Sequence, residues 1–301
     1  MERPYILHML TPGSHMSPFD VNMAADAGYQ MIVPYCGVDT KATAGLTQDA
    51  IFSRGPKGVA RTGLFIGGRD VHQAADMLDA ARQAMVPPFI VSVFADPSGS
   101  YTTAAALVAC VLSQLQKTHS TGLSGMRVLI LGGTGTVGRI AGVLAAAQGA
   151  SVLLSSHQGL DAARRAADET SRRFGVRLDG VSGSDSAAVR AALAGADVVL
   201  GTAAAGVQVL SEADLSVASR LLVAADVNAV PPEGIAGVGV MDNGKPLAGT
   251  HAVGIGALAV GNVKYQVQHR LLQRMRNADK PVALSFPEAF ELACDVLAEV
   301  K

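Results

Sequence analysis

The sequence has no tryptophan and only three cysteines among its 301 residues. Cys36, Cys110 and Cys294 lie far apart and form neither a Cys-x-x-Cys motif nor a metal-ligand spacing. The seven histidines are scattered in the same way, without a pair at helical ligand spacing. We therefore expect no metal site and interpret the cysteines as buried free thiols in a reducing compartment.

Charge is also scarce: charged residues make up 16 % of the chain and the formal net charge is −1. Nucleic acid is not an expected partner, because phosphate binding needs clustered Lys and Arg. The longest apolar run, near residues 102–112, is shorter than the ~18–20 residues of a membrane span, so no membrane partner is expected either. The first ten residues lack a basic leader and a cleavage pattern, which favours a cytoplasmic location.

Hydrophobic residues make up 49 % of the chain, and short apolar runs alternate with longer helical patterns. This alternation predicts an α/β fold of parallel βαβ units. A Ser-, Thr- and Gly-rich stretch at residues 118–125 separates two series of such units. The expected strands are Tyr5–Met9, Met31–Pro34, Gly63–Gly67, Phe89–Phe94, Arg127–Leu131, Ser151–Ser155, Arg177–Gly180, Asp197–Gly201 and Leu221–Asp226.

The pattern divides the chain into two lobes. Residues 1–120 are expected to form a parallel α/β substrate lobe, and residues 121–263 a Rossmann-like dinucleotide-binding lobe. The helical pattern from about residue 264 to residue 301 is expected to return to the first lobe. A helix from Ser17, one over Leu160–Phe174 and a last one with Pro287 in its first turn are among the predicted helices.

The strongest motif follows the strand Arg127–Leu131 and opens a helix, which is the context that gives a Gly-x-Gly-x-x-Gly match its meaning. Its glycines allow a tight turn, a close approach to a pyrophosphate and close helix–strand packing, with the phosphates at the helix N-terminus. The alternative is a glycine-rich turn without a ligand. The predicted cofactor-binding residues of the turn are Gly133, Thr134, Gly135, Thr136, Val137 and Gly138.

An NAD-preferring site usually has an acidic residue at the end of its second strand, to bind the ribose 2′-OH. Here the second strand ends in Ser-Ser-His-Gln, residues 155–158, so NADP is allowed and NAD is not excluded. Ser156 and His157 are candidates for the 2′-phosphate, against the alternative of a solvated loop. Strand ends further along add four candidate cofactor contacts, namely Ala203, Ala204, Asp226 and Asn228.

Two stretches of the first lobe place carboxylates near expected strand ends. Ser17-Pro18-Phe19-Asp20 either positions Asp20 for a ligand or forms a helix-capping box. Asp96, followed by hydroxyl residues up to Thr102 and Thr103, is either part of a site or a plain βα turn.

Several long stretches together carry a resemblance to a known family: LHMLTPGSHMSPFDVNMAADAG, GLTQDAIFSR, FADPSGSYTTAAA, LGGTGTVG, ADVNAVPPEGIAG and HAVGIGALAVGNVKYQ. They resemble the NAD(P)-dependent methylene-tetrahydromethanopterin dehydrogenases of methylotrophic bacteria, over nearly the whole chain. That family is distantly similar in architecture to the methylene-tetrahydrofolate dehydrogenases.

The resemblance implies hydride transfer from N5,N10-methylene-tetrahydromethanopterin to NAD(P)⁺, without metal or flavin, in the oxidation of formaldehyde-derived one-carbon units. It also implies a homo-oligomer, a trimer or a hexamer. The NADP-restricted relatives carry a basic residue where this chain has residues 155–158, so we expect use of both NAD and NADP.

The reaction needs alignment of the methylene carbon with the nicotinamide and tolerance of a developing positive charge. Asp20 and Asp96 are the candidates for that charge or for the pterin ring, and Thr102 and Thr103 for hydrogen bonds to the substrate. Lys264 matches a family lysine near the pterin and is expected to bind a pterin oxygen or pair with an Asp, unless it is a solvated helix lysine.

Three other interpretations are each consistent with part of the sequence. A tetrahydrofolate-specific enzyme would use the same chemistry, and only substrate comparison separates it. An NAD(P)-sensing regulator usually has its glycine turn near the start of the chain, whereas here a full lobe precedes it. A quinone or sugar dehydrogenase would need a Tyr-x-x-x-Lys pair, which the sequence lacks.

Overall fold

The computed structural model of the protein describes residues 3–299. The chain folds into two compact units. The first combines the chain up to Thr102 with Tyr265–Leu292, and the second combines Thr103–Lys264 with the chain from Ala293 onward. The predicted boundary at residues 120–121 lies one helix later, since helix α5 (Ser100–His119) belongs almost entirely to the second unit. Among the described residues no helix has the length and hydropathy needed to cross a bilayer.

The first unit is built on a five-stranded parallel sheet in the order β12-β4-β3-β1-β2. Its strands are β1 (Ile6–Thr11), β2 (Met31–Cys36), β3 (Thr62–Ile66), β4 (Ser92–Ala95) and β12 (Ala283–Leu284). The order 2-1-3-4-5 is one of the two common doubly wound arrangements, in which ligands bind where strand order reverses, here between β1 and β3.

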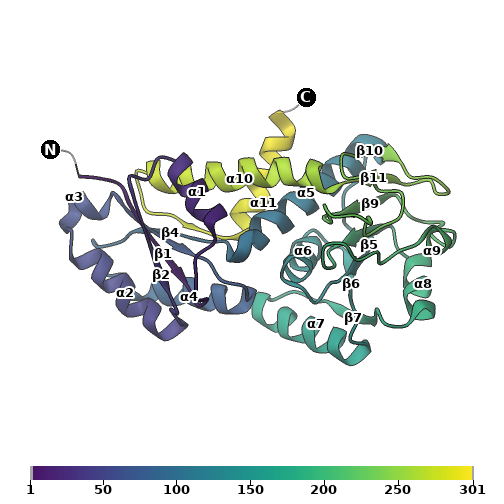
Figure 1. The fold of residues 1–301 in the computed structure, drawn as a ribbon, viewed down its shortest axis with the longest axis horizontal. Coiled ribbons are helices and arrows are strands. Elements are labelled where there is room, and N and C mark those ends of the chain that lie inside the picture. The colour runs from purple at the N-terminus through teal and green to yellow at the C-terminus, as the bar shows by residue number, and fades with distance from the viewer. Residues whose placement is uncertain (1–2, 300–301) are drawn as a thin grey trace. The chain divides into compact units, whose positions relative to one another are not determined.

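Helices cover both faces of this sheet (Figure 1). Helices α2 (Thr40–Phe52) and α4 (Val71–Ala84) pack side by side on one face, with the short α3 (Gly55–Val59) nearby. Helix α1 (Pro18–Asp26) and the second half of α10 (Ala257–Asn277) lie on the other. All five residues of β3 are buried, and Phe65 meets Phe94 of β4 edge to face at 5.5 Å between ring centroids. Burial on both faces explains the continuous apolar run of this strand.

The second unit contains a seven-stranded sheet in the order β10-β11-β9-β8-β5-β6-β7, in which β10 is antiparallel to its neighbour. The strands are β5 (Arg127–Leu131), β6 (Ser151–Ser156), β7 (Asp179–Ser182), β8 (Val198–Gly201), β9 (Val223–Asp226), β10 (Asn243–Pro246) and β11 (Val253–Ile255). Counted from β5, the order is 3-2-1-4-5-7-6, in which the first five strands follow the Rossmann arrangement and the reversal lies between β5 and β8. The predicted Rossmann-like fold is therefore confirmed.

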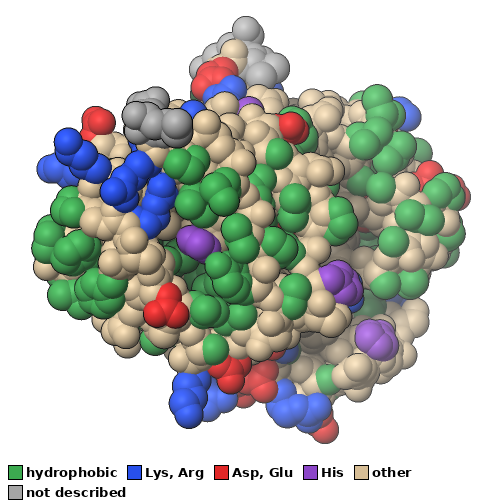
Figure 2. Space-filling model, turned by 60° about the vertical axis from the view of Figure 1, so that its left-hand side comes forward, with side chains coloured by type: hydrophobic (Ala, Val, Ile, Leu, Met, Phe, Trp, Pro, Cys, Tyr) green, Lys and Arg blue, Asp and Glu red, His purple; other side chains and the backbone are tan. Residues whose placement is uncertain are grey.

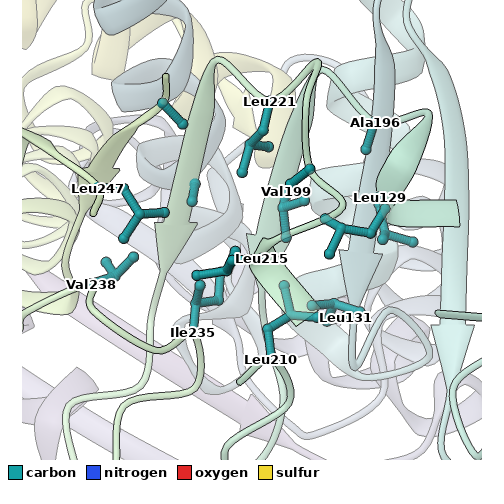
Figure 3. Packing of buried hydrophobic residues seen from close by; sticks show 14 of the residues in the cluster. Leu129, Leu131, Ala196, Val199, Leu210, Leu215, Leu221, Ile235, Val238 and Leu247 are labelled. Carbon is teal, nitrogen blue, oxygen red and sulfur yellow. The ribbon is translucent and has the colours of Figure 1, made fainter. Parts of the chain in front are cut away.

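One side of this sheet holds a continuous apolar core (Figure 3). Leu129, Leu131 and Val199 point from the strands toward Leu215 of α9 (Glu212–Leu215) and Ile235 of a loop, and all five are at most 4 % exposed. Each such side chain contributes about 1.5–3 kcal/mol by leaving water. Helix α8 (Ser186–Ala194) packs into the same cluster through Val189 and Leu193. Helices α6 (Thr136–Ala147) and α7 (Leu160–Phe174) contact β6.

Part of the tail, Tyr265–Leu292, belongs to the first unit, whereas the predicted return extends from about residue 264 to residue 301. Strand β12 pairs with β4, and helix α11 (Phe286–Glu299) follows it with Pro287 in the first turn. Phe286 meets Tyr101 edge to face at 5.2 Å between ring centroids. The expected strand Arg177–Gly180 is shifted by two residues, because Leu178 first donates its N–H to the Ser171 hydroxyl of α7.

Candidate functional site

The glycine turn after β5 packs tightly against neighbouring backbone. Gly132 has φ +70, and a Cβ there would lie 2.6 Å from the backbone N and Cα of Ala203. A Cβ on Gly133 would lie 2.8 Å from the Ile130 carbonyl oxygen, and one on Gly138 would lie 2.7 Å from Gly133 Cα. These approaches admit only hydrogen in place of a side chain. The residue with left-handed backbone is Gly132, one position before the predicted motif. The Gly-x-Gly-x-x-Gly pattern alone does not identify this glycine.

Helix α6 begins directly after this turn with Gly135 as its N-cap residue. Gly135 provides no side chain, and its own N–H donates to the Gly132 carbonyl at 3.0 Å. Thr136 and Val137 are the first helical residues and are partly exposed. The carbonyl of Thr134 accepts a hydrogen bond from Arg139 Nε at 3.0 Å, which fixes the turn to α6. A glycine-capped helix start of this kind provides backbone N–H groups and a positive dipole end for phosphate.

The end of β6 is polar and closely packed. Ser156 is 1 % exposed, and its hydroxyl accepts from the Gln158 N–H at 3.2 Å. Its carbonyl accepts from Gly183 N–H at 2.7 Å, an approach that a Cβ on Gly183 would prevent. His157 is exposed beside it. Of the two predicted 2′-phosphate contacts, His157 therefore presents its side chain to solvent, whereas the Ser156 hydroxyl is turned into its own loop.

Two loops that follow β8 and β9 are tied to each other by Asn228. Its side-chain oxygen accepts from the N–H groups of Gly206 and Val230, each at 3.0 Å, and its nitrogen donates to the Pro232 carbonyl at 2.8 Å. Ala203 is half-buried and Ala204 is exposed in the first of these loops. The side chain of Asn228 thus braces the loop that carries both alanines.

Asp226 has a similar bracing role. It is 2 % exposed and accepts from the N–H groups of Asn228 at 3.0 Å, Gly234 at 2.7 Å and Ile235 at 3.1 Å. Burial raises the pKa of the Asp226 carboxyl, although the three backbone donors lower it. Both predicted cofactor residues of this strand end therefore shape the loops with their side chains, and direct contact with a dinucleotide stays a prediction.

A cavity of about 770 Å³ lies in the first unit, at the carboxyl ends of β1 and β3. It is lined by residues 11–18 and Asp20 after β1, by residues 68–70 and Gln73 after β3, and by Ser98. This is the point where the strand order of the sheet reverses, which is where open α/β sheets bind ligands. The cavity is therefore the candidate substrate site of this unit.

Asp20 is the predicted carboxylate that lines this cavity. It is in the first turn of α1 and 2 % exposed, and its Oδ1 accepts from Gln268 Nε2 at 2.7 Å. Ser17 is the N-cap residue and Pro18 follows, as predicted, but the Ser17 side chain makes no capping hydrogen bond. The capping-box alternative is therefore wrong. Gln268 is 0 % exposed, and nothing in the sequence signals it, because 248 residues separate it from Asp20.

Asp96 has different surroundings. Its Oδ1 accepts from the N–H groups of Tyr101 and Thr102 at 3.0 and 3.1 Å, and its Oδ2 accepts from the Thr102 hydroxyl at 2.7 Å. Asp96 and Thr102 are both 0 % exposed. This carboxylate binds the first turn of α5, as the βα-turn alternative expects. Thr103 is half-buried in the same helix, and none of these three residues lines the cavity.

Lys264 lies in α10 and is half-buried. It precedes Gln268 by four residues, so the two side chains share one face of the helix one turn apart. Groups of three or more His, Cys, Asp or Glu side chains that could hold a metal ion do not occur within residues 3–299.

Comparison with known proteins adds the following. A family model described as methylene-tetrahydromethanopterin dehydrogenase, N-terminal, matches residues 18–98. The chain is 50 % identical over 291 residues to the NAD(P)-dependent methylenetetrahydromethanopterin dehydrogenase of Methylorubrum extorquens, covering 97 % of this chain and 98 % of the relative. It is 33 % identical over 277 residues to the bifunctional protein MdtA of the same organism, covering 92 % and 93 %. The structure of shikimate 5-dehydrogenase from Listeria monocytogenes is similar in fold, with a TM-score of 0.53, 13 % identity, and coverage of 99 % and 96 %.

Proposed function

The chain belongs to the family of NAD(P)-dependent methylenetetrahydromethanopterin dehydrogenases, and we propose that it oxidises N5,N10-methylene-tetrahydromethanopterin with NAD⁺ or NADP⁺. The observation that carries this proposal is the 50 % identity over 97 % of the chain. The methylene carbon loses a hydride, which becomes the new C4 hydrogen of the nicotinamide. The products are the methenyl cation and NAD(P)H, so charge and electrons balance.

The second unit fits the dinucleotide. The bound nicotinamide supplies the hydride acceptor. Gly132, Gly133 and Gly138 let the turn pack closely against neighbouring backbone, where a Cβ would clash, and the glycine-capped start of α6 offers N–H groups to a pyrophosphate. We propose that Thr134, Gly135, Thr136 and Val137 form the wall of this phosphate site.

The adenosine end of the site is proposed to accept both cofactors. No carboxylate occurs among residues 155–158, so a 2′-phosphate meets no like charge there. His157 is exposed and can donate to that phosphate, while Ser156 shapes the loop. Both NAD and NADP are therefore proposed to bind.

In the first unit the cavity at the β1–β3 reversal is proposed to hold the pterin. Asp20 brings a buried carboxyl group to its wall. A fixed carboxylate stabilises the positive charge that develops as the hydride leaves, because it needs no reorganisation at that moment. We assign Asp20 to this charge or to N–H groups of the pterin ring.

Lys264 is proposed to bind a pterin oxygen or to pair with an Asp. A lysine directly beside the reacting carbon would oppose the developing cation, so its role is to position the substrate. Asp96 and Thr102 are proposed to support the substrate lobe by fixing the start of α5, and Thr103 stays a predicted substrate contact.

The test is the initial rate of reduced-nicotinamide formation with methylene-tetrahydromethanopterin, using NAD⁺ and NADP⁺ separately, beside methylene-tetrahydrofolate. Turnover of the methanopterin substrate with both cofactors supports the proposal. Faster turnover of the folate substrate favours a tetrahydrofolate enzyme. Dinucleotide binding without turnover of either substrate favours an NAD(P) sensor.

Two variants sharpen this test. Asp20→Asn removes the charge at the cavity and is expected to lower kcat about 100-fold while the dissociation constant for NADPH stays unchanged. Asp26→Asn makes the same change at the exposed end of the same helix and is expected to leave kcat unchanged. Equal effects of the two substitutions would contradict the assignment of Asp20.

We also propose that the protein is a homo-oligomer, a trimer or a hexamer, with no nucleic-acid or membrane partner. Hydrophobic side chains are exposed on the face shown in Figure 2. In the first unit Met31, Phe52 and Val86 are 48 %, 55 % and 48 % exposed, and Met31 begins the edge strand β2. Sedimentation velocity of the wild type and of Met31→Lys tests this. The protein's part in formaldehyde oxidation is predicted from the family resemblance, and its cytoplasmic location is predicted from the sequence. Both stay predictions.

A further inference from the structure

Gln268 brings a hydrogen-bond donor to Asp20 from the far end of the chain. Its side chain is fully buried in α10, and its Nε2 donates to Asp20 Oδ1 at 2.7 Å. Asp20 is nearly as buried and lines the cavity at the β1–β3 reversal. Two buried polar groups in a direct hydrogen bond restrict each other's rotamers, because breaking a buried hydrogen bond costs free energy that water does not return.

The amide suits a carboxylate that must keep its charge. It donates a hydrogen without adding a positive charge, so it orients the carboxylate without neutralising it. The first turn of α1 adds its dipole in the direction that favours the ionised form. A buried carboxylate that is oriented and ionised before the reaction is the group that stabilises a developing cation at low reorganisation cost.

We propose that Gln268 is a positioning residue that holds the Asp20 carboxylate toward the cavity for hydride transfer. This inference rests on the proposed function. Gln268 acts through Asp20 and does not itself line the cavity. Helix α10 then carries two groups of the proposed machinery one turn apart, with Lys264 preceding Gln268 on the same face.

The substitution Gln268→Glu distinguishes a positioning role from a merely structural role, because only the positioning role predicts a changed pH profile. The new carboxyl group would lie at hydrogen-bond distance from Asp20, and two buried carboxylates at that distance share one proton. While the pair keeps that proton, the protonated Glu donates to Asp20 and replaces the amide. Once the proton is lost at higher pH, the two charges repel each other and Asp20 leaves its position.

The expected result is a falling limb in the pH profile of kcat. At about pH 6 the variant should turn over methylene-tetrahydromethanopterin within about threefold of the wild type, and by about pH 9 at least tenfold more slowly, since buried Glu carboxyls can titrate near pH 8–9. The wild type has no ionisable group at this position. The other charged groups nearby occur in both proteins, so the wild-type pH profile serves as their control. They are Lys264, which lies one helical turn before Gln268, and the cavity-lining residues His15, Arg69 and Asp70.

Two further variants complete the experiment. Gln268→Leu removes the donor at similar size and should lower kcat about 10- to 100-fold at every pH, with KM changed less than about threefold, as expected for a misplaced reacting group. Gln266→Glu is the matched control. It makes the same substitution on a partly exposed position of α10, where Gln266 accepts from Arg270 at 3.3 Å, and should keep the wild-type profile.

The outcomes separate the inference from the function on which it rests. If the wild type does not turn over the methanopterin substrate, the proposed function fails and the positioning role fails with it. If the wild type is active but Gln268→Glu shows the same pH profile as Gln266→Glu, the function stands and the positioning role is overturned. A Gln268→Leu variant that melts at a lower temperature yet keeps its kcat also overturns it, because the bond would then serve stability alone.

Discussion

Replacing Gly132 by alanine tests whether the turn after β5 is built for close approach. Gly132 has φ +70, a left-handed conformation that costs an alanine about 1–2 kcal/mol. Its new Cβ would also lie 2.6 Å from two backbone atoms of Ala203, whereas ordinary contact begins at 3.4 Å. The turn and the loop after β8 would have to separate by the difference, 3.4 − 2.6 = 0.8 Å. Overpacking of that kind adds about 1–3 kcal/mol.

Gly175 provides the matched control. It ends α7 with the same φ of +70, and a Cβ there would meet no atom within 4 Å. Gly175→Ala should therefore cost only the conformational term, about 1–2 kcal/mol in urea unfolding. Gly132→Ala should cost about 2–5 kcal/mol, the sum of the two terms.

The binding measurement then decides the reasoning. Fluorescence titration with NADPH should show a dissociation constant at least about tenfold higher for Gly132→Ala, equivalent to about 1.4 kcal/mol, and an unchanged value for Gly175→Ala. If both variants unfold at the same urea concentration and bind NADPH equally well, the close approach at Ala203 has no part in the dinucleotide site.

Three further predictions concern single side chains. Asp96→Asn should lower the free energy of unfolding by about 2 kcal/mol, because the carboxylate binds the start of α5, and should change kcat by less than about threefold. A loss of kcat at unchanged stability would instead indicate that Asp96 contacts the substrate. The pKa of Asp214 is lowered from 3.8, chiefly by the Ser211 hydroxyl, so its stabilising effect is present above pH 3.8 and is lost as pH falls through the folded pKa. Asp214→Asn should therefore cost about 1 kcal/mol at pH 7 and have no effect in stronger acid, as measured by urea unfolding across pH. His157→Glu should raise the dissociation constant for NADP⁺ about tenfold and leave that for NAD⁺ nearly unchanged in equilibrium titration, since the new charge would meet only the 2′-phosphate.

The second unit was the more predictable one because its signals are local in sequence. The strand Arg127–Leu131 and the helix Leu160–Phe174 have the predicted bounds, since hydrophobic periodicity and flanking glycines define both. The strand over Asn243–Pro246 could not be predicted, because two polar residues, a glycine and a proline carry no strand pattern and pair only through their antiparallel neighbour.

The site residues also differ in how far their signals are local in sequence. The glycine turn follows from short-range spacing. The role of Asp96 in fixing the start of α5 was an open alternative, because its donors Tyr101 and Thr102 lie within six residues of it. The buried bond between Asp20 and Gln268 joins positions 248 residues apart, and a glutamine in a helix gives no signal of its own. The side-chain hydrogen bonds of Asp226 and Asn228 depend on the path of the loop after β9, which brings Pro232 and Gly234 back to the strand end. Hydrophobic periodicity does not specify the path of a loop.

Each unit is a doubly wound sheet, and each places its candidate site where its strand order reverses. The residues at the two reversals nevertheless differ in kind. The second sheet offers glycines and backbone N–H groups, which suit a phosphate whose negative charge exists before binding. The first offers a buried carboxylate held by an uncharged amide, which suits a positive charge that appears only during reaction. The fold accounts for the location of both candidate sites, and the chemical groups at the two reversals, backbone N–H in one sheet and a carboxyl in the other, differ in the charge that they suit.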